Sequence, residues 1–248
     1  RRCHFANYTK TLDSVHFRVL AQGNRNAPIC TDCHTAHEVT LPQEPRVKIA
    51  KTCSTCHQAI YNTYIASVHG KALVDENNLD VPVCTYCHGV HNITDPRTAS
   101  FRLEIPQLCA QCHANTALMA KYGLSIDVIK TYLRDFHGVT VTLARKQRPD
   151  ILSYEAVCTD CHGIHDIAST RGAASSPIKA NLLLVCQRCH PSATQNFPDA
   201  WMSHYEPSPS RAPLVFYVKW FYRILIPFMV TGLSLYVVVN LWRTFSNR

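Results

Sequence analysis

The longest uncharged apolar stretch of the chain lies near its C-terminus. Residues 224–242 contain nineteen positions without a charged side chain. As a helix this stretch would rise about 28 Å, enough to cross the hydrocarbon core of a bilayer. Trp220 and Tyr222 precede it and Trp242 ends it, which is typical of residues at a membrane surface. A buried helix of a soluble protein is the alternative. We predict one transmembrane helix in an anchor segment, 213–248.

The rest of the chain has only short groups of apolar residues. Helical periodicity is visible in segments 60–68 and 126–136. Each segment leads to a histidine and a glycine, His69-Gly70 and His137-Gly138. Because glycine commonly follows the last residue of a helix, we expect each helix to end there and to present its histidine.

A Cys-x-x-Cys-His motif recurs along this region. Two thiols at this spacing can each add to one vinyl group of a haem, and the adjacent histidine then lies under the iron as its first axial ligand. A zinc knuckle, a redox dithiol or a disulfide needs no histidine directly after the second cysteine. We therefore predict covalent c-type haem sites. The complete motifs are Cys30/Cys33/His34, Cys53/Cys56/His57, Cys84/Cys87/His88, Cys109/Cys112/His113, Cys158/Cys161/His162 and Cys186/Cys189/His190.

The thirteenth cysteine, Cys3, is followed by His4. The first cysteine of such a motif would lie one position before Arg1. We interpret the chain as beginning inside a seventh motif, with residues upstream. A free cysteine or attachment through a single thioether is the alternative. This interpretation predicts about seven haems.

A second set of seven histidines also follows the repeat. Four stand alone after every other motif, and three lie three residues after a motif histidine. They are His16, His69, His137 and His204, and His37, His91 and His165. Since no histidine of the fourteen is left over, we predict two axial histidines for each iron.

The pairing of these histidines with haems is left open by the sequence. A histidine three residues after the motif cannot reach the opposite face of its own haem, so we expect it to bind the iron of a neighbour. Met119 and Met202 are competing ligands that lack the repeat position. Ligation by histidine alone implies low reduction potentials, because methionine is the ligand that raises them.

About thirty residues per haem are too few for an ordinary hydrophobic core. We therefore expect a mostly irregular fold with short α-helices, a core made of haem, and one transmembrane α-helix. The predicted division is a first haem unit at 1–50, a second at 51–106, a third at 107–180, a last haem and Pro-rich linker at 181–212, and the anchor at 213–248.

The 248 residues carry a formal net charge of +8. A basic chain can bind nucleic acid, but no basic run here is interleaved with aromatic residues. Seven haems would add roughly fourteen propionate charges, so the excess of Lys and Arg is better explained by haem. We predict no nucleic-acid partner.

Two stretches carry a resemblance to a known group. Residues 67–73 with 84–91, and 136–138 with 158–167, are similar to the doubled-motif, low-potential multihaem c-type cytochromes. With the tail, the chain resembles membrane-anchored multihaem cytochromes of quinone-linked respiratory complexes. The resemblance implies electron transport between an integral membrane subunit of such a complex and a periplasmic redox protein. Since c-type cytochromes mature outside the cytoplasmic membrane, it also implies a periplasmic haem domain, membrane lipid around the tail, and Arg248 toward the cytoplasm.

Two enzymatic alternatives stay open. One is a catalytic multihaem oxidoreductase similar to nitrite reductase or hydroxylamine oxidoreductase, with an active-site haem upstream. The other is direct quinol dehydrogenation. A Cys-x-x-Cys-Lys motif is absent from the sequence, and every iron has two candidate ligands. We therefore predict no catalytic residue and no enzymatic activity of the chain by itself.

Overall fold

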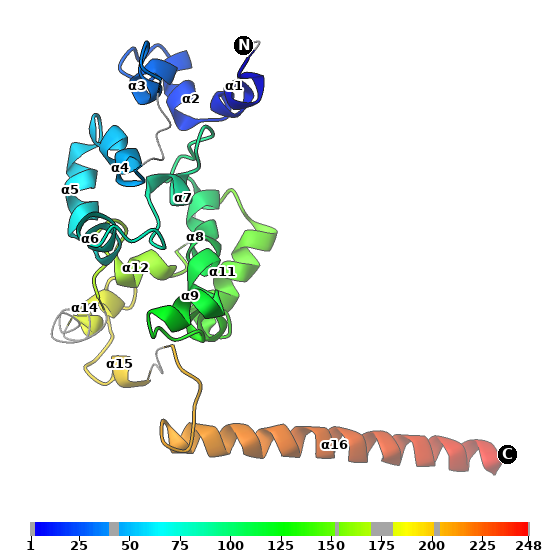
Figure 1. The fold of residues 1–248 in the computed structure, drawn as a ribbon. Helices are drawn as coiled ribbons and strands as arrows, with labels where there is room; N and C mark the ends of the chain where they lie inside the picture. Colours follow the sequence, from blue (N-terminus) through cyan, green and yellow to red (C-terminus); the bar gives the residue numbers. More distant parts are fainter. Residues whose placement is uncertain (1–2, 40–44, 152–153, 170–180, 201–203, 248) are drawn as a thin grey trace. The chain divides into compact units, whose positions relative to one another are not determined.

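The computed structural model describes residues 3–39, 45–151, 154–169, 181–200 and 204–247. The chain separates into two compact units, 1–199 and 200–248. Within the described ranges, every regular element is a helix and none is a strand. Short helices joined by irregular segments make up the first unit (Figure 1). This confirms the predicted mixture of helical and irregular structure. The finer five-part division remains a prediction.

The helices of the first unit follow one another in short steps. Their bounds are α1 Phe5–Leu12, α2 Val15–Ala21, α3 Cys30–His34, α4 Val47–Ser54, α5 Gln58–Ala66, α6 Val68–Asp75, α7 Cys84–His88, α8 Ala99–His113, α9 Thr116–Lys121, α10 Val128–Tyr132, α11 Phe136–Gln147, α12 Cys158–His162 and α14 Leu182–Gln187. A further helix, α15, spans Phe197–Ala200.

One repeat of the chain consists of a motif, a lone histidine, and a second motif with another histidine three residues after it. In the described residues two small apolar cores support this unit, one around each of the two repeats that contain two complete motifs, those at His57 and His88 and at His113 and His162. The first is formed by Ala50, Tyr64, Leu73 and Val83. The second is formed by Leu103, Val141, Ala144 and Val157. The two repeats also share a hydrogen bond from a tyrosine hydroxyl to a backbone carbonyl two residues before a motif cysteine. The bonds are Tyr64 to Pro82 at 2.7 Å and Tyr132 to Ala156 at 2.9 Å.

Gly70 and Gly138 do not end helices, so that prediction is wrong. The preceding helices α5 and α10 end earlier, at Ala66 and Tyr132, and the glycines lie in the first turns of α6 and α11. A Cβ atom on Gly70 would overlap the carbonyl oxygen of Tyr64, and one on Gly138 would overlap that of Tyr132. Glycine is required here because two helices meet at a close backbone approach.

The capping residues explain why new helices begin at these points. The Ser67 side chain accepts a hydrogen bond from the backbone N–H of Gly70 at 3.1 Å. In the next repeat the Asp135 side chain accepts one from Gly138 at 2.9 Å. Serine and aspartate are favoured at helix N-termini because they satisfy N–H groups that have no partner within the helix. His69 and His137 are therefore held in the first turn of a capped helix.

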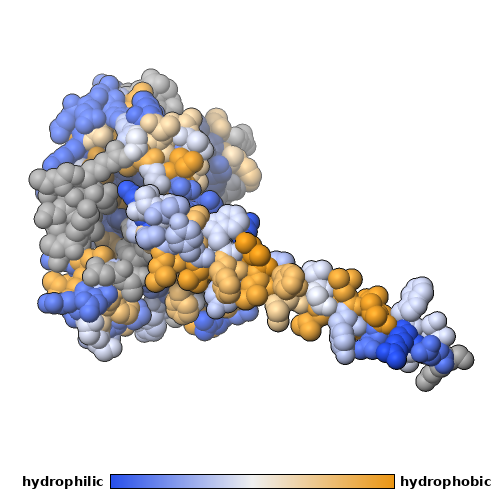
Figure 2. Space-filling view, turned by 90° about the horizontal axis from the view of Figure 1, so that it is seen from below, coloured by the Kyte–Doolittle hydropathy of each residue, from blue (hydrophilic) through white to orange (hydrophobic). Residues whose placement is uncertain are grey.

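The second unit contains one long helix, α16, which spans Pro213–Ser246 and has 34 residues. It is long and apolar enough to cross a membrane, and its apolar window has a mean hydropathy of 2.1 with none of it buried. Figure 2 shows apolar side chains along much of this helix. The predicted span 224–242 lies inside it, and the helix continues through Pro227. Lys219 lies in α16 before this span and pairs with Glu206 at 2.9 Å.

Candidate functional site

The six complete motifs occur in two alternating settings. In one setting the motif is a separate five-residue helix, as in α3, α7 and α12. In the other it follows or ends a longer helix, as at α4, α8 and α14. Since residues i and i+3 share one face of a helix, each motif that lies wholly in a helix presents both thiols on the same side. In the described part of the chain all thirteen cysteines are free of disulfides.

Cys56 and Cys189 depart from this arrangement, because they lie outside the helices that carry the first cysteines of their motifs. Helix α4 ends at Ser54 and α14 ends at Gln187, so both residues lie on the turn that follows. The chain still winds as one helical turn. The backbone N–H of His57 donates to the Cys53 carbonyl at 3.0 Å, and that of His190 donates to the Cys186 carbonyl at 2.8 Å. The spacing of the motif is therefore kept without a continuous helix.

The thiols also differ in exposure, which the motif spacing did not predict. Cys56 and Cys189 are exposed, whereas Cys53 and Cys186, the first cysteines of the same motifs, are partly buried. Haem attachment stays a prediction at these two cysteines, as it does at the other motif cysteines. The exposed cysteines are Cys3, Cys30, Cys33, Cys56, Cys87 and Cys189, and the partly buried ones are Cys53, Cys84, Cys109, Cys112, Cys158, Cys161 and Cys186.

The five-residue motif helices are fixed by local hydrogen bonds. Asp32 accepts a bond from the backbone N–H of Ile29 at 2.7 Å, and Asp160 accepts the equivalent bond from Val157 at 2.7 Å. These helices end at a residue with positive φ, which turns the chain away from the motif. That residue is Thr35 (63°), Gly89 (84°) or Gly163 (81°).

Cysteines of the two motifs within one repeat lie in contact. The Cys53 thiol donates a hydrogen bond to the sulfur of Cys84, which raises the pKa of Cys53 and lowers that of Cys84. Cys109 and Cys158 repeat this arrangement, with the same raised and lowered pKa values for the same reason. The two motifs of a repeat therefore bring their first cysteines together.

Cysteines of successive repeats are also neighbours. Although Cys33 is an exposed residue, the chain around its thiol keeps part of the water away, and this raises the pKa of Cys33. The nearby Cys53 thiol raises it further, with a smaller effect from Cys56. Burial likewise raises the pKa of Cys161 to about 11, and Asp160 and the thiols of the next motif add to this. That next motif contributes through Cys186 and Cys189.

Cys87 has the same relation to the motif that follows it. Cys87 is an exposed residue, but the chain around its thiol keeps part of the water away and raises its pKa, and the nearby thiols of Cys109 and Cys112 raise it further. Thiols that share a hydrogen bond within a repeat thus alternate with thiols that affect one another only through their charge between repeats. The six motifs form a row in sequence order, and both cysteines of a following motif, including the exposed Cys56 and Cys189, lie near the motif before it.

Among the contacts that the structure describes, ten histidines lie in five pairs whose ring planes are nearly parallel or tilted. Every pair joins one motif histidine to one histidine of the second set. The pairs and their ring-centroid distances are His16–His57 at 6.2 Å, His34–His91 at 6.0 Å, His69–His113 at 6.4 Å, His88–His165 at 6.2 Å and His137–His190 at 6.3 Å.

The pairs follow one rule. A histidine that stands alone, such as His16, faces the first motif of the next repeat, here at His57. A histidine three residues after a motif, such as His91, faces the second motif of the preceding repeat, here at His34. Neighbouring repeats therefore exchange histidines in both directions. The sequence pattern identified the two classes but not this exchange.

The spacing within the pairs fits a metal ion held between two imidazoles. With metal–nitrogen distances of about 2.0–2.1 Å and roughly 1 Å from each nitrogen to its ring centre, the two ring centres would lie about 6 Å apart. Burial favours the neutral imidazole, which is the form that binds metal. It lowers the pKa of His69 to about 4, with a smaller contribution from His113. It also lowers the pKa of His16, to which His57 adds.

Four predicted ligands lie outside these pairs. His4 and His37 are exposed, and no described ring faces either of them. His162 is partly buried at the end of α12, and burial lowers its pKa, with a smaller effect from His113. His204 is partly buried in the second compact unit. Among the described residues no group of three or more His, Cys, Asp or Glu side chains is placed to hold a metal by itself.

Met119 and Met202 are the methionines that the sequence offers as competing ligands. Met119 is buried in α9, with 3% of its surface exposed. Met202 lies outside the described residues. The histidine pairs therefore remain the arrangement that best fits an axial ligand set.

Several residues that support the histidines were missed by sequence reasoning. Phe101 stacks on His88 with ring centroids 5.5 Å apart and planes 6° apart. Phe197 lies against His190 at 5.2 Å. An isolated phenylalanine carries no signal of this role. Stacking of this kind restricts the rotation of the imidazole ring.

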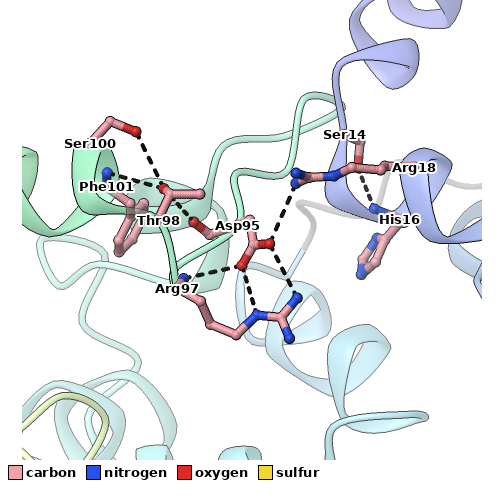
Figure 3. A network of polar contacts seen from close by, with 8 residues as sticks. All are labelled: Ser14, His16, Arg18, Asp95, Arg97, Thr98, Ser100 and Phe101. Carbon is pink, nitrogen blue, oxygen red and sulfur yellow. Dashed lines mark hydrogen bonds and ion pairs between the residues drawn. The ribbon is translucent and has the colours of Figure 1, made fainter. Parts of the chain in front are cut away.

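A polar network fixes the helix that carries His16. Asp95 accepts hydrogen bonds from Arg97 at 3.0 and 3.2 Å and from Arg18 at 3.4 Å (Figure 3). The backbone N–H of Val15 donates to the carbonyl of Ile93 at 2.8 Å. Arg18 and Val15 belong to α2, whereas the acceptors follow His91. The repeated His-x-Ile or His-x-Val sequence after three motifs is a signal that could have located this contact.

Comparisons with known proteins support the class of cofactor. A family model described as cytochrome c3 matches residues 23–114, which include four complete motifs. The match supports a multihaem c-type cytochrome, with c-type haem as cofactor and electron transfer as the class of function. No curated protein and no solved structure matches the chain.

Proposed function

We propose that the chain is an electron-transfer subunit whose c-type haems, about seven in number, have two axial histidines each. The observation that carries this proposal is the set of five imidazole pairs, each next to a Cys-x-x-Cys motif and each spaced for one metal ion. The family match supports the haem chemistry independently.

The pairs support a specific assignment of ligands. At each complete motif the two cysteines would hold one haem, the motif histidine would be one ligand of its iron, and a histidine of a neighbouring repeat would be the other. The second ligands are His91 for the haem at His34, His16 for His57, His165 for His88, His69 for His113 and His137 for His190. His4, His37, His162 and His204 remain predicted ligands.

The chain's own residues suit a carrier of single electrons better than a catalyst. The haem supplies a reversible iron redox couple, and its potential is low when both axial ligands are histidine. With an imidazole on each face the iron has no position left for a substrate. The capped helices and stacked phenylalanines hold these imidazoles in place, so that little rearrangement accompanies a change of charge.

The row of motifs supports a defined path for electrons. Cys33 is near Cys53, Cys53 contacts Cys84, and the same alternation continues through Cys109 and Cys158 to Cys186. Haems attached to these cysteines would follow one another in the order of the sequence. Their iron redox couples would then supply a path for electrons along this row.

The tail supports a place for this path in the cell. We propose that α16 anchors the chain in the cytoplasmic membrane as a single span, with the haem unit on the periplasmic face. An integral membrane subunit of a quinone-linked respiratory complex then exchanges electrons with one end of the row. A periplasmic redox protein exchanges them with the other.

The ligation is tested by counting spin states. The protein is extracted from membranes in mild detergent, total haem is measured, and low-spin ferric haem is quantified by electron paramagnetic resonance. We expect at least five low-spin haems per chain. Fewer than five would overturn the ligand assignment. The partner is tested separately by analysing the same extract for an integral membrane subunit; purification as a stable monomer would contradict that part.

A further inference from the structure

The repeats are joined by the same interface twice. Between the first two, the backbone N–H of Val15 donates to the carbonyl of Ile93 at 2.8 Å, and His91 faces His34. Between the next two, Val68 donates to the carbonyl of Ile167 at 2.9 Å, and His165 faces His88. Each interface therefore uses one histidine and one carbonyl two residues later.

The first repeat carries the same pair of groups at its free edge. His37 and Val39 occupy the positions that His91 and Ile93 occupy in the second repeat. His37 is exposed, and the Val39 side chain is 67% exposed. In the described part of the chain no ring faces His37, and no backbone N–H reaches the Val39 carbonyl.

The turn before His37 is already formed. Thr35 has a φ of 63°, close to the values of Gly89 and Gly163, its counterparts before His91 and His165. The Thr35 hydroxyl donates to the carbonyls of His34 and Glu38, at 2.6 and 2.7 Å. A non-glycine residue is strained in this region of backbone conformation. The segment is therefore held in the conformation that presents a histidine to another haem.

His4 completes the edge. By its place in the repeat, His4 corresponds to His57 and His113, which face the lone histidines His16 and His69 of the preceding repeat. No described ring faces His4. In the other repeats each lone histidine comes earlier in the chain than the motif histidine that it faces.

We propose that His4, His37 and Val39 form an open half of the repeat interface, and that its occupant is another haem-bearing segment of the same kind. This segment supplies an imidazole to the iron at His4 and accepts His37 as the second ligand of its own c-type haem. The Val39 carbonyl accepts a hydrogen bond from its backbone. The proposal rests on the ligand assignment above, and it assigns His37 to a haem outside these 248 residues.

Two variants test this proposal in two preparations. His37→Leu and the matched control His91→Leu are compared in the 248-residue chain produced alone and in the assembly extracted from membranes. Low-spin and high-spin ferric haem are counted by electron paramagnetic resonance, and carbon monoxide binding is measured after reduction. Leucine cannot ligate iron, so each lost ligand exposes one iron.

In the chain alone we expect His37→Leu to leave the spin states unchanged and His91→Leu to convert one haem to high spin. In the assembly each variant converts one haem. Conversion by His37→Leu in the chain alone, or no conversion by it in the assembly, would overturn the proposed edge. No conversion by His91→Leu in either preparation would instead overturn the ligand assignment on which the edge rests.

A second variant covers failure of assembly. His37→Met keeps a ligand, so we expect it to preserve the low-spin count in the assembly while raising the reduction potential of one haem. An unchanged set of potentials would count against the proposal. The source of the segment follows from a denaturing gel of the assembly stained for haem. A single stained band with a mass above that of these 248 residues indicates that the segment belongs to the same polypeptide. A second stained band indicates that it belongs to another subunit.

Discussion

His165 lies against His88, with ring centroids 6.2 Å apart and planes 24° apart, although the two histidines belong to different repeats. The backbone N–H of Val68 donates to the carbonyl of Ile167, two residues after His165, so the same repeats are also joined by a hydrogen bond. If each iron takes one imidazole from its own motif and one from a neighbour, haem binding and repeat assembly are a single event. The free energy of haem ligation then contributes directly to the stability of the fold.

Replacing His165 by methionine provides a direct test of this pair. We expect His165→Met to raise the potential of one haem, because a thioether ligand favours the reduced iron more than an imidazole does. Redox titration followed by visible absorption measures the change. Met119→Leu is the control, since Met119 is only 3% exposed and lies in α9. Potentials that shift in Met119→Leu but not in His165→Met would favour methionine ligation instead.

The close helix approach at Gly138 is expected to be sensitive to a single methyl group. A Cβ on this residue would overlap the carbonyl oxygen of Tyr132, and backbone atoms cannot move aside as a flexible side chain can. We expect Gly138→Ala to lower the free energy of unfolding by at least about 2 kcal/mol. Denaturant unfolding of the holoprotein measures it.

Gly232→Ala serves as the control for that experiment. No atom lies within 4 Å of a Cβ placed on Gly232, which lies within α16. Alanine favours a helix over glycine, so the control should be neutral or slightly stabilising. Equal losses in both variants would show that the crossing at Gly138 is not a tight contact.

The motifs carried most of the information that the sequence held about the site. Cys30, Cys33 and His34 specify their chemistry by spacing alone, and the apolar run of the tail specifies a long helix. The pairing of His34 with His91 could not be predicted, because it depends on how one repeat packs on the next. A local sequence pattern predicts the conformation of the residues around it, but it does not predict which distant residue will lie against them.

Exposure of the thiols is a second property that spacing does not encode. Cys56 and Cys189 have the same place in the motif as Cys112 and Cys161, yet the first two are exposed and the other two are partly buried. The motif of Cys112 ends inside α8 and that of Cys161 forms α12, whereas α4 and α14 end before Cys56 and Cys189. Where a helix ends and what packs on it are set by the surrounding chain.

The errors have the same origin. Gly70 has the local signature of a helix end, yet it lies where two helices approach closely and the Tyr64 carbonyl leaves no room for a side chain. Asp95 pairs with its sequence neighbour Arg97, but no local pattern indicates its contact with Arg18, which lies 77 residues away in another repeat. Both roles arise from tertiary packing, which overrides what neighbouring residues indicate.

Asp95 should make the stability of the haem unit depend on acid pH. Hydrogen bonds from Arg97 hold the pKa of Asp95 below its ordinary value, with a smaller effect from Arg18. A carboxylate whose pKa is lowered in the folded state stabilises the fold at pH values above its pKa in the unfolded chain, about 3.9. This contribution is lost as the pH falls through the lower pKa of the folded state. Asp95→Asn should therefore be less stable than the parent at pH 7, and this difference should shrink as the pH falls below about 3.9.

The comparison requires a carboxylate that lacks these partners. Asp75 at the end of α6 is exposed, and no described side chain pairs with it. We expect Asp75→Asn to follow the parent across the whole pH range. Thermal unfolding at several pH values measures both variants. A constant difference between Asp95→Asn and the parent would exclude a contribution from the ionised carboxylate.

Arg102 is expected to stabilise the motif at Cys158 through a paired hydrogen bond. Its guanidinium donates to both carboxylate oxygens of Asp160, at 3.0 and 2.7 Å, and to the carbonyl of Glu155 at 2.9 Å. Both side chains are about two-thirds buried, with 28% and 33% exposed. We expect Arg102→Ala to cost about 1–3 kcal/mol, because it leaves a partly buried carboxylate with fewer partners.

Arg145→Ala is the matched control for Arg102→Ala. Arg145 also pairs with a carboxylate, that of Glu104 at 2.6 Å, but these side chains are 41% and 43% exposed. Exposed ion pairs contribute between zero and about 1 kcal/mol. Denaturant unfolding of both variants gives the difference. Equal effects would mean that Arg102 acts as an ordinary surface charge.

Removal of residues 213–248 tests the anchor without disturbing the haem sites of the first unit. That unit spans 1–199 and has its own two cores, whereas α16 belongs to the second unit. Since α16 is the described helix that is apolar enough to cross a bilayer, the shortened chain should be released from membranes into the aqueous fraction. Its low-spin haem count should equal that of the full chain. A shortened chain that stays in membranes after a high-salt wash would show that a surface of the haem unit, rather than α16, binds the membrane or its partner.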